Sequence, residues 1–339
     1  MNLVSRSIAV AAVSGFALLP FARIVHADAA SALRCQRTIN KELAKFVKTK
    51  TKILQKCKNG AVTKADPASP VDCPLTPQDD KINAAAQKMR DKIAAKCGGA
   101  NKLCNTADLG ENADEPLAAI GWNIGACPDL HGEGCVNAIN DCNDIGTCLT
   151  CIGHKAVNQS TELYYDLLTA AEFGSGSALN DCQAMIGKAT AKFLETKSKL
   201  LHKCWDKVLQ GKDGYTSPPG CPDTDPSVPN KTIEKIAAAE QKKIAKICEA
   251  CGAGGDADAD NVCDVPGSAF TPAAIGFEPD CPDATVPGSP TSCVRVISTL
   301  GDLIACVDCI TEFDVDCSTA LAVPAQKAYP AECSAIPGP

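Results

Sequence analysis

Residues 35–57, CQRTINKELAKFVKTKTKILQKC, recur at residues 182–204 as CQAMIGKATAKFLETKSKLLHKC. The two stretches align without a gap and share 13 identities in 23 positions. In the first copy, residues at spacings of four and seven form one helical stripe: Cys35, Ile39, Phe46, Ile53 and Cys57. The chain therefore predicts the same long, lysine-rich amphipathic helix twice.

A frame of nine cysteines surrounds each copy of this helix. The first frame is Cys35, Cys57, Cys73, Cys97, Cys104, Cys127, Cys135, Cys148 and Cys151. The second is Cys182, Cys204, Cys221, Cys248, Cys263, Cys281, Cys293, Cys306 and Cys309. The total of 22 cysteines is even, and a duplicated frame is typical of a disulfide-stapled fold. We expect up to eleven disulfides, which supplement the small core of a chain with only 4% aromatic residues.

A second helix is expected to follow each lysine-rich helix after a Pro- and Gly-containing loop, at 58–76 and at 205–229. The first of these helices begins near Thr76-Pro77. Its predicted buried face is Ile82, Ala86, Met89, Ile93 and Cys97, and the second copy offers Ile233, Ala237, Ile244 and Cys248. An Ala-Ala-Ile-Gly-aromatic element follows at 118–122 and 273–277, and helix is expected to resume near Cys135 and Cys293. The sequence thus predicts an all-α fold of two homologous disulfide-stapled modules. Each module opens with an antiparallel helical hairpin and carries long acidic loops.

Helix geometry restricts the disulfides of each hairpin. A helix over residues 35–57 is about 33 Å long, so its two cysteines lie too far apart to be bonded to each other. Bonds across the connecting loops are expected between Cys57 and Cys73 and between Cys204 and Cys221. At the other end of each hairpin two partners stay open. Cys35 is expected to pair with Cys97 or Cys104, and Cys182 with Cys248 or Cys251.

The chain resembles secreted cysteine-rich helical-repeat proteins of environmental bacteria that have no assigned function. The resemblance rests on the C-x(21)-C lysine-rich helix, the Ile-Gly-aromatic element and the later C-x-x-C, and it covers most of the mature chain. It implies a helical-repeat fold and supplies no catalytic residues.

The N-terminus reads as a secretory signal. Arg6 precedes an apolar stretch, Ile8 to Leu19, which is too short for an ordinary transmembrane helix. Val25-His26-Ala27 fits a cleavage site, with a neighbouring cut after Ala29 as the alternative. The predicted organisation is a signal peptide at 1–27, a first module at 28–172, a linker at 173–178 and a second module at 179–339. We expect a secreted protein, extracellular or periplasmic, with no membrane span after cleavage.

Three C-x-x-C pairs occur, at 148/151, 248/251 and 306/309. A redox dithiol normally sits on a βαβ-type scaffold, and none precedes these pairs. We therefore expect each cysteine to bond a different neighbour. A redox or electron-transfer role through these pairs is the second alternative function.

An Asp-rich stretch at 255–264 is the sharpest local motif. Carboxylates at alternate positions are typical of Ca²⁺ loops. The candidate ligands are Asp256, Asp258, Asp260 and Asp264. Asn261 stands where the helix-loop-helix version has Gly, and no Glu follows at the twelfth position. A calcium- or metal-binding exoprotein is the first alternative function; otherwise no cofactor is expected.

Lysines recur along both copies of the first helix. They are Lys41, Lys45, Lys50, Lys52 and Lys56 in one copy and Lys188, Lys192, Lys197, Lys199 and Lys203 in the other. The chain as a whole carries a formal charge of −7, so these rows are a local basic feature. They are candidates for binding an anionic polymer or for self-association. Nucleic acid is not expected, because no recognised motif, aromatic interleaving or overall basicity accompanies them.

Motifs of common enzymes are missing from the sequence. It contains no G-x-S-x-G, H-E-x-x-H, P-loop or G-x-G-x-x-G pattern, and four histidines in total. We therefore expect a secreted, non-enzymatic, disulfide-rich protein with a binding or structural role and an unknown ligand.

Overall fold

The computed structural model describes residues 29–64, 73–105, 107–132, 134–165, 178–212, 221, 231–252, 263, 269–282, 292–324 and 333. The helices in these residues are α1 (Ala29–Lys64), α2 (Thr76–Cys97), α3 (Cys142–Tyr165), α4 (Ala178–Leu209), α5 (Lys231–Ala250), the short α6 (Pro272–Ile275) and α7 (Leu300–Leu321), with a 3₁₀ turn η1 at Gly110–Asn112. The described residues contain no strand; two isolated antiparallel bridges join Ala126 to Ala138 and Asp280 to Val296. The all-α prediction is confirmed.

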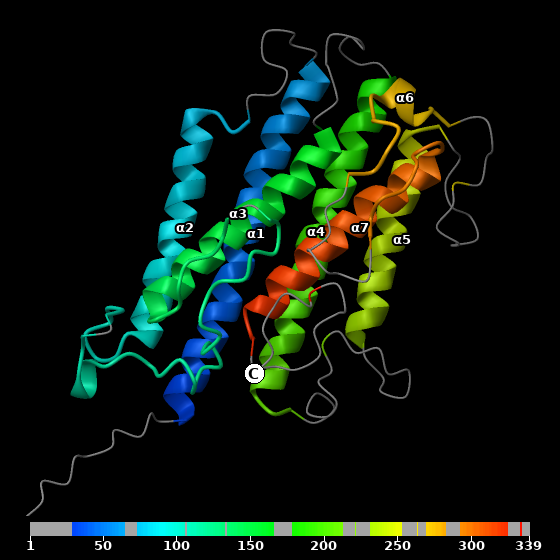
Figure 1. The fold of residues 1–339 in the computed structure, drawn as a ribbon. Coiled ribbons are helices and arrows are strands. Elements are labelled where there is room, and N and C mark those ends of the chain that lie inside the picture. Colours follow the sequence, from blue (N-terminus) through cyan, green and yellow to red (C-terminus); the bar gives the residue numbers. More distant parts are fainter. Residues whose placement is uncertain are drawn as a thin grey trace, which may run out of the picture.

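The long helices form two layers (Figure 1). In one layer α2, α1, α4 and α5 lie side by side, and in the other α3 and α7 cross one face of it. The α3 helix packs against α1 and α2, while α7 packs against α4 and against α3. No helix in the described ranges is both long and apolar enough to cross a membrane.

Helical periodicity selects the buried faces of α1 and α2. All five residues predicted for α2, from Ile82 to Cys97, are buried. In α1, Cys35, Ile39 and Phe46 are at most 1% exposed. The Ile-Gly-aromatic elements are also buried in both halves, through Ile120 with Trp122 and Ile275 with Phe277.

The predicted face of α5 is only partly right. Ile244 and Cys248 are buried, whereas Ile233 is 40% exposed and Ala237 is exposed. The remaining buried positions are Lys243 and Ile247. Lys243 is buried because it forms an ion pair with Asp308 of α7. A prediction from hydropathy leaves a lysine out of the buried face, and this is why it selected the wrong positions on α5.

Helix ends also differ from the predictions. Helix α1 continues seven residues into the expected loop 58–76, to Lys64, and α4 continues into the expected loop 205–229, to Leu209. The third helix of each half starts later than Cys135 and Cys293, at Cys142 in α3 and Leu300 in α7. Side-chain caps fix these starts: Asp141 Oδ1 accepts hydrogen bonds from the backbone N–H of Asn143 and Asp144, and Thr299 forms a capping box with Asp302.

All 22 cysteines are paired in eleven disulfides. The loop-closing bonds are Cys57–Cys73 and Cys204–Cys221, as the hairpin arrangement predicts. Where sequence left alternatives, Cys35 bonds Cys97 and Cys182 bonds Cys251. Cys248 instead bonds Cys263, and Cys104 bonds Cys142. Cys317 of α7 bonds Cys333 near the C-terminus.

Two buried clusters form the core, and their boundary does not follow the sequence repeat. One cluster joins α1, α2 and α3 to the C-terminal parts of α4 and α7, through residues such as Leu201 and Phe313. The other joins α5 to the N-terminal parts of α4 and α7, through residues such as Ile186 and Leu303. Helices α4 and α7 therefore serve both clusters, and so do α1 and α3, because Val62, Tyr164 and Tyr165 belong to the second cluster. The expected signal peptide, and all of the expected linker except Ala178, lie outside the described residues.

Candidate anion-binding groove

The predicted calcium ligands cannot be placed, because Asp256, Asp258, Asp260 and Asp264 lie outside the described residues. Within the described part of the chain, Cys104, Asp114 and Cys142 bring three potential ligand atoms within 4.8 Å of one another. The two sulfur atoms are bonded to each other. They are not thiolates, so this group lacks the donors that a metal requires from cysteine.

The C-x-x-C cysteines bond partners in other segments. Cys148 and Cys151 of α3 bond Cys127 and Cys135. Their counterparts Cys306 and Cys309 of α7 bond Cys281 and Cys293. No C-x-x-C in the chain forms an internal disulfide, as expected. The pairs fasten the bridged loops onto α3 and α7.

A buried polar cluster joins α7 to the first half of the chain. His131 Nε2 lies 2.9 Å from Asp314 Oδ1, and both side chains are 1% exposed. Ser160 of α3 donates to the other oxygen of Asp314. The serine contacts the carboxylate and not the imidazole, so this is not the nucleophile–base–acid order of a catalytic triad. It is a buried polar link between segments.

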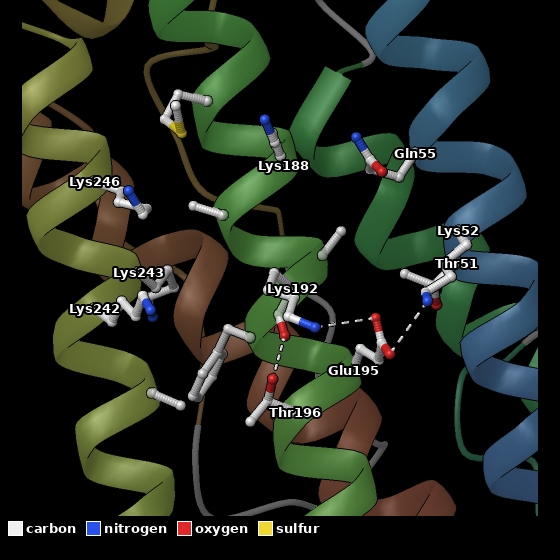
Figure 2. Close-up of a pocket in the computed structure, with 15 residues that line it drawn as sticks. Thr51, Lys52, Gln55, Lys188, Lys192, Glu195, Thr196, Lys242, Lys243 and Lys246 are labelled. Atoms are coloured by element: carbon white, nitrogen blue, oxygen red, sulfur yellow. Dashed lines mark hydrogen bonds and ion pairs between the residues drawn. The ribbon is translucent and has the colours of Figure 1, made fainter.

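An open groove of about 570 Å³ lies along α4, between α1 and α5 (Figure 2). We call it the lysine groove. Its charged lining comprises Lys52 of α1, Lys188, Lys192 and Glu195 of α4, and Lys242, Lys243 and Lys246 of α5. Six lysines thus share the groove with one carboxylate. In a chain of net charge −7, this is a local concentration of positive charge.

Helical spacing places these lysines on the two walls. Lys188 and Lys192 are four residues apart on α4, and Lys242 and Lys246 are four apart on α5, so each pair lies on one face of its helix. Figure 2 shows the two pairs on facing helices. Lys197 lies nine residues after Lys188, about 180° around α4, and it faces α7. The groove therefore opens on the side of α4 away from α7.

Glu195 neutralises only one end of the groove. Its carboxylate lies 2.7 Å from Lys48 Nζ, 3.5 Å from Lys52 Nζ and 3.6 Å from Lys192 Nζ. Burial raises the pKa of Glu195, but the three lysines outweigh that effect and hold the pKa below its usual value. Glu195 is therefore ionised, and three lysines share its single charge.

Lys243 lies at the base of the groove and links α5 to α4 and α7. Its ammonium lies 4.4 Å from the centroid of the Phe193 ring and forms an ion pair with Asp308. The side chain is 1% exposed, so Lys243 is a structural cation whose charge is already used. Its ion pair fastens α5 to α7.

Lys188, Lys242 and Lys246 remain available. All three are exposed and make no hydrogen bond or ion pair with the described part of the chain. Sequence reasoning singled out Lys188 in the lysine rows but missed the α5 lysines. The signal for the latter was the i, i+4 spacing of Lys242 and Lys246. The rows themselves divide between two faces, because Lys50 and Lys197 are buried, at 2% and 5% exposure.

No protein-family model, curated protein or solved structure matches this chain.

Proposed function

We propose that this protein acts outside the cytoplasm as a non-catalytic binding protein whose lysine groove holds anionic ligands. The observation that carries the proposal is the set of three lysines, Lys188, Lys242 and Lys246, that line one groove without a carboxylate partner in the described residues. Ammonium groups that line one groove repel one another, and an anion bound between them offsets the repulsion. The eleven disulfides support the extracellular part of the proposal.

The test is binding to heparin, a soluble anionic polymer, measured by titration calorimetry on the oxidised mature protein. The variant K188Q/K242Q/K246Q removes the three available charges. Exposed ion pairs contribute up to about 1 kcal/mol each, so affinity should fall about 10-fold to 100-fold. Because such contacts are screened, affinity should also fall as salt rises from 0.05 to 0.3 M.

The matched control is K41Q/K56Q/K203Q. These lysines are exposed and lie outside the lining of the groove, and the control has the same net charge as the test variant. Both variants lose three positive charges, and this change in net charge should weaken heparin binding equally in the two. Beyond that shared loss, the control should bind heparin within about twofold of the wild-type affinity. Equal losses in both variants would mean that heparin responds to overall charge, and the groove would then not be the binding site.

A further inference from the structure

The lysine groove has an apolar floor beneath its charged rim. The floor is formed by Met185, Ala189, Ala191, Phe193 and Ala239, which line the groove from α4 and α5. Thr51, Gln55 and Thr196 supply the neutral polar groups of the lining. The aliphatic stems of the lysines add further apolar surface below their ammonium groups. A fully hydrated polyanion would touch the rim and leave this floor unused.

We propose that the groove selects a small amphiphilic anion, with an anionic head between the lysines and an apolar body on the alanine, methionine and phenylalanine floor. This inference rests on the proposed function and specifies its ligand class. The volume of about 570 Å³ is within the range of small-molecule sites, and apolar surface with a few placed charges is typical of such sites.

Charge placement supports the same geometry. Lys243 is neutralised by Asp308 at the base, and Lys52 and Lys192 share Glu195 at the α1 side. The available ammonium groups of Lys188, Lys242 and Lys246 are exposed. An anionic head is therefore favoured at the opening, while the body displaces water from the floor.

The methyl groups of two methionines allow this mode of binding to be measured directly. Of its three methionines, Met185 lines the groove, whereas Met89 is buried in the α2 face at 2% exposure. The protein is produced with ¹³C-methyl methionine and titrated with decyl sulfate below its micelle concentration, followed by methyl NMR. The polar reference ligand is ethyl sulfate, which has the same head and almost no apolar body.

Decyl sulfate should shift the Met185 methyl resonance, leave that of Met89 in place, and bind at least about tenfold more tightly than ethyl sulfate. The variant A239W fills the floor without removing a lysine and should weaken decyl sulfate binding about tenfold or more. Ala238, exposed on α5 and outside the groove lining, provides the control A238W.

Equal affinity for decyl and ethyl sulfate, or equal shifts at Met185 and Met89, would overturn the amphiphile inference. Heparin binding that depends on the three lysines would then still stand, so the proposed function would survive. If the wild-type protein bound neither heparin nor either of the two sulfates, the proposed function would be refuted as well.

Discussion

Lys50 and Lys197 occupy the same position of the duplicated helix and should respond in opposite ways to the same substitution. Lys197 Nζ lies 2.7 Å from Glu312 Oε1 and 3.0 Å from Asp316 Oδ2. Lys50 Nζ lies 2.7 Å from the backbone oxygen of His154 and 2.9 Å from its Nδ1. His154 and Glu312 are themselves counterparts, three residues after the second cysteine of each C-x-x-C. One buried lysine therefore bonds two carboxylates, and the other bonds a histidine.

The two environments move the lysine pKa values apart. Burial lowers the pKa of Lys50 from 10.5 to about 7, and the more distant charges of Glu162 and Asp79 oppose this only in part. Burial also lowers the pKa of Lys197, but Asp316 and Glu312 outweigh it and raise the pKa above its ordinary value. Burial and the charge of Lys50 lower the pKa of His154 to about 4, so it is a neutral partner at pH 6 and above.

The substitutions are K50M and K197M, in which methionine keeps the length of the side chain. Removing Lys197 leaves two carboxylates without their shared cation, which costs about 3–5 kcal/mol of unfolding free energy. For Lys50, the fall in pKa from 10.5 to about 7 corresponds to at most about 5 kcal/mol of destabilisation below pH 7. K50M removes this destabilisation and loses hydrogen bonds to His154 that contribute about 1–3 kcal/mol. At pH 6, K50M should therefore be at least as stable as the wild type.

The pH dependence of the stability difference between the wild type and K50M provides an independent test. The folded pKa of Lys50 is below the unfolded value, so the unfolded chain binds the extra proton between about pH 7 and pH 10.5. Wild-type stability relative to K50M should rise through this window, by up to about 1.4 kcal/mol per pH unit. Urea unfolding with intact disulfides, followed by circular dichroism from pH 6 to pH 10, measures both effects. Equal destabilisation by K50M and K197M at pH 6, with no change in the K50M difference up to pH 10, would refute the reasoning.

Four further outcomes are expected. Burial and the neighbouring carboxyl of Asp308 raise the pKa of Glu240 to about 8, so wild-type stability relative to E240Q should fall between pH 4.5 and pH 8; a flat difference in thermal unfolding midpoints would contradict this. Removing Cys57–Cys73, which closes a separation of 16 residues, should lower the free energy of unfolding by about 3 kcal/mol. Removing Cys35–Cys97, with a separation of 62, should lower it by about 4 kcal/mol. Urea unfolding of the two double-serine variants measures both losses. Alkylation of the denatured protein without reductant should label no cysteine by mass spectrometry, since none is free; labelling at C-x-x-C positions would revive a redox role. E195K should destabilise by about 1–2 kcal/mol, because it places a lysine against Lys48, Lys52 and Lys192, and more at low salt than at high salt; E195Q is the matched neutral variant, with a smaller loss.

The parts of the fold that depend on local pattern were predictable. The buried face of α2 follows from a 3.6-residue period, and the pairing of Cys57 with Cys73 follows from a hairpin whose connecting loop joins these two cysteines. The choice of Cys251 over Cys248 as partner of Cys182 was not predictable. The two candidates are three residues apart, so both lie near the same helix end. The division of the core between two clusters depends on how α1, α3, α4 and α7 pack together, and the sequence period does not contain that information.

For the candidate site, the sequence predicted the concentration of lysines but not the groove that they line. The lysine rows indicate where positive charge is concentrated, but the burial of Lys197 depends on carboxylates more than 110 residues away. The groove itself needs the side-by-side arrangement of α1, α4 and α5, and its α5 wall was missed. The apolar floor was also missed, because Ala189 and Ala239 read as ordinary helix-forming residues until their helices are brought together.

The packing of α1 on α4 explains why the two copies of the helix diverge at Glu195. The contacts run antiparallel: Arg37 pairs with Asp206, Lys48 with Glu195, and the Asn40 side chain donates to the backbone oxygen of His202. In an antiparallel packing of two like helices, one position lies at the centre and meets its own counterpart. Lys48 and Glu195 are that position in the aligned copies.

Two identical helices would place lysine against lysine at this centre, with Lys52 and Lys192 close by, and like charges at such a contact are destabilising. A glutamate in one copy replaces this repulsion by three attractions. The carboxylate of Glu195 pairs with Lys48, Lys52 and Lys192 at the α1–α4 contact. Among the residues that the structure describes, Lys188, Lys242 and Lys246 have no ion-pair partner, so their charge takes no part in this helix contact.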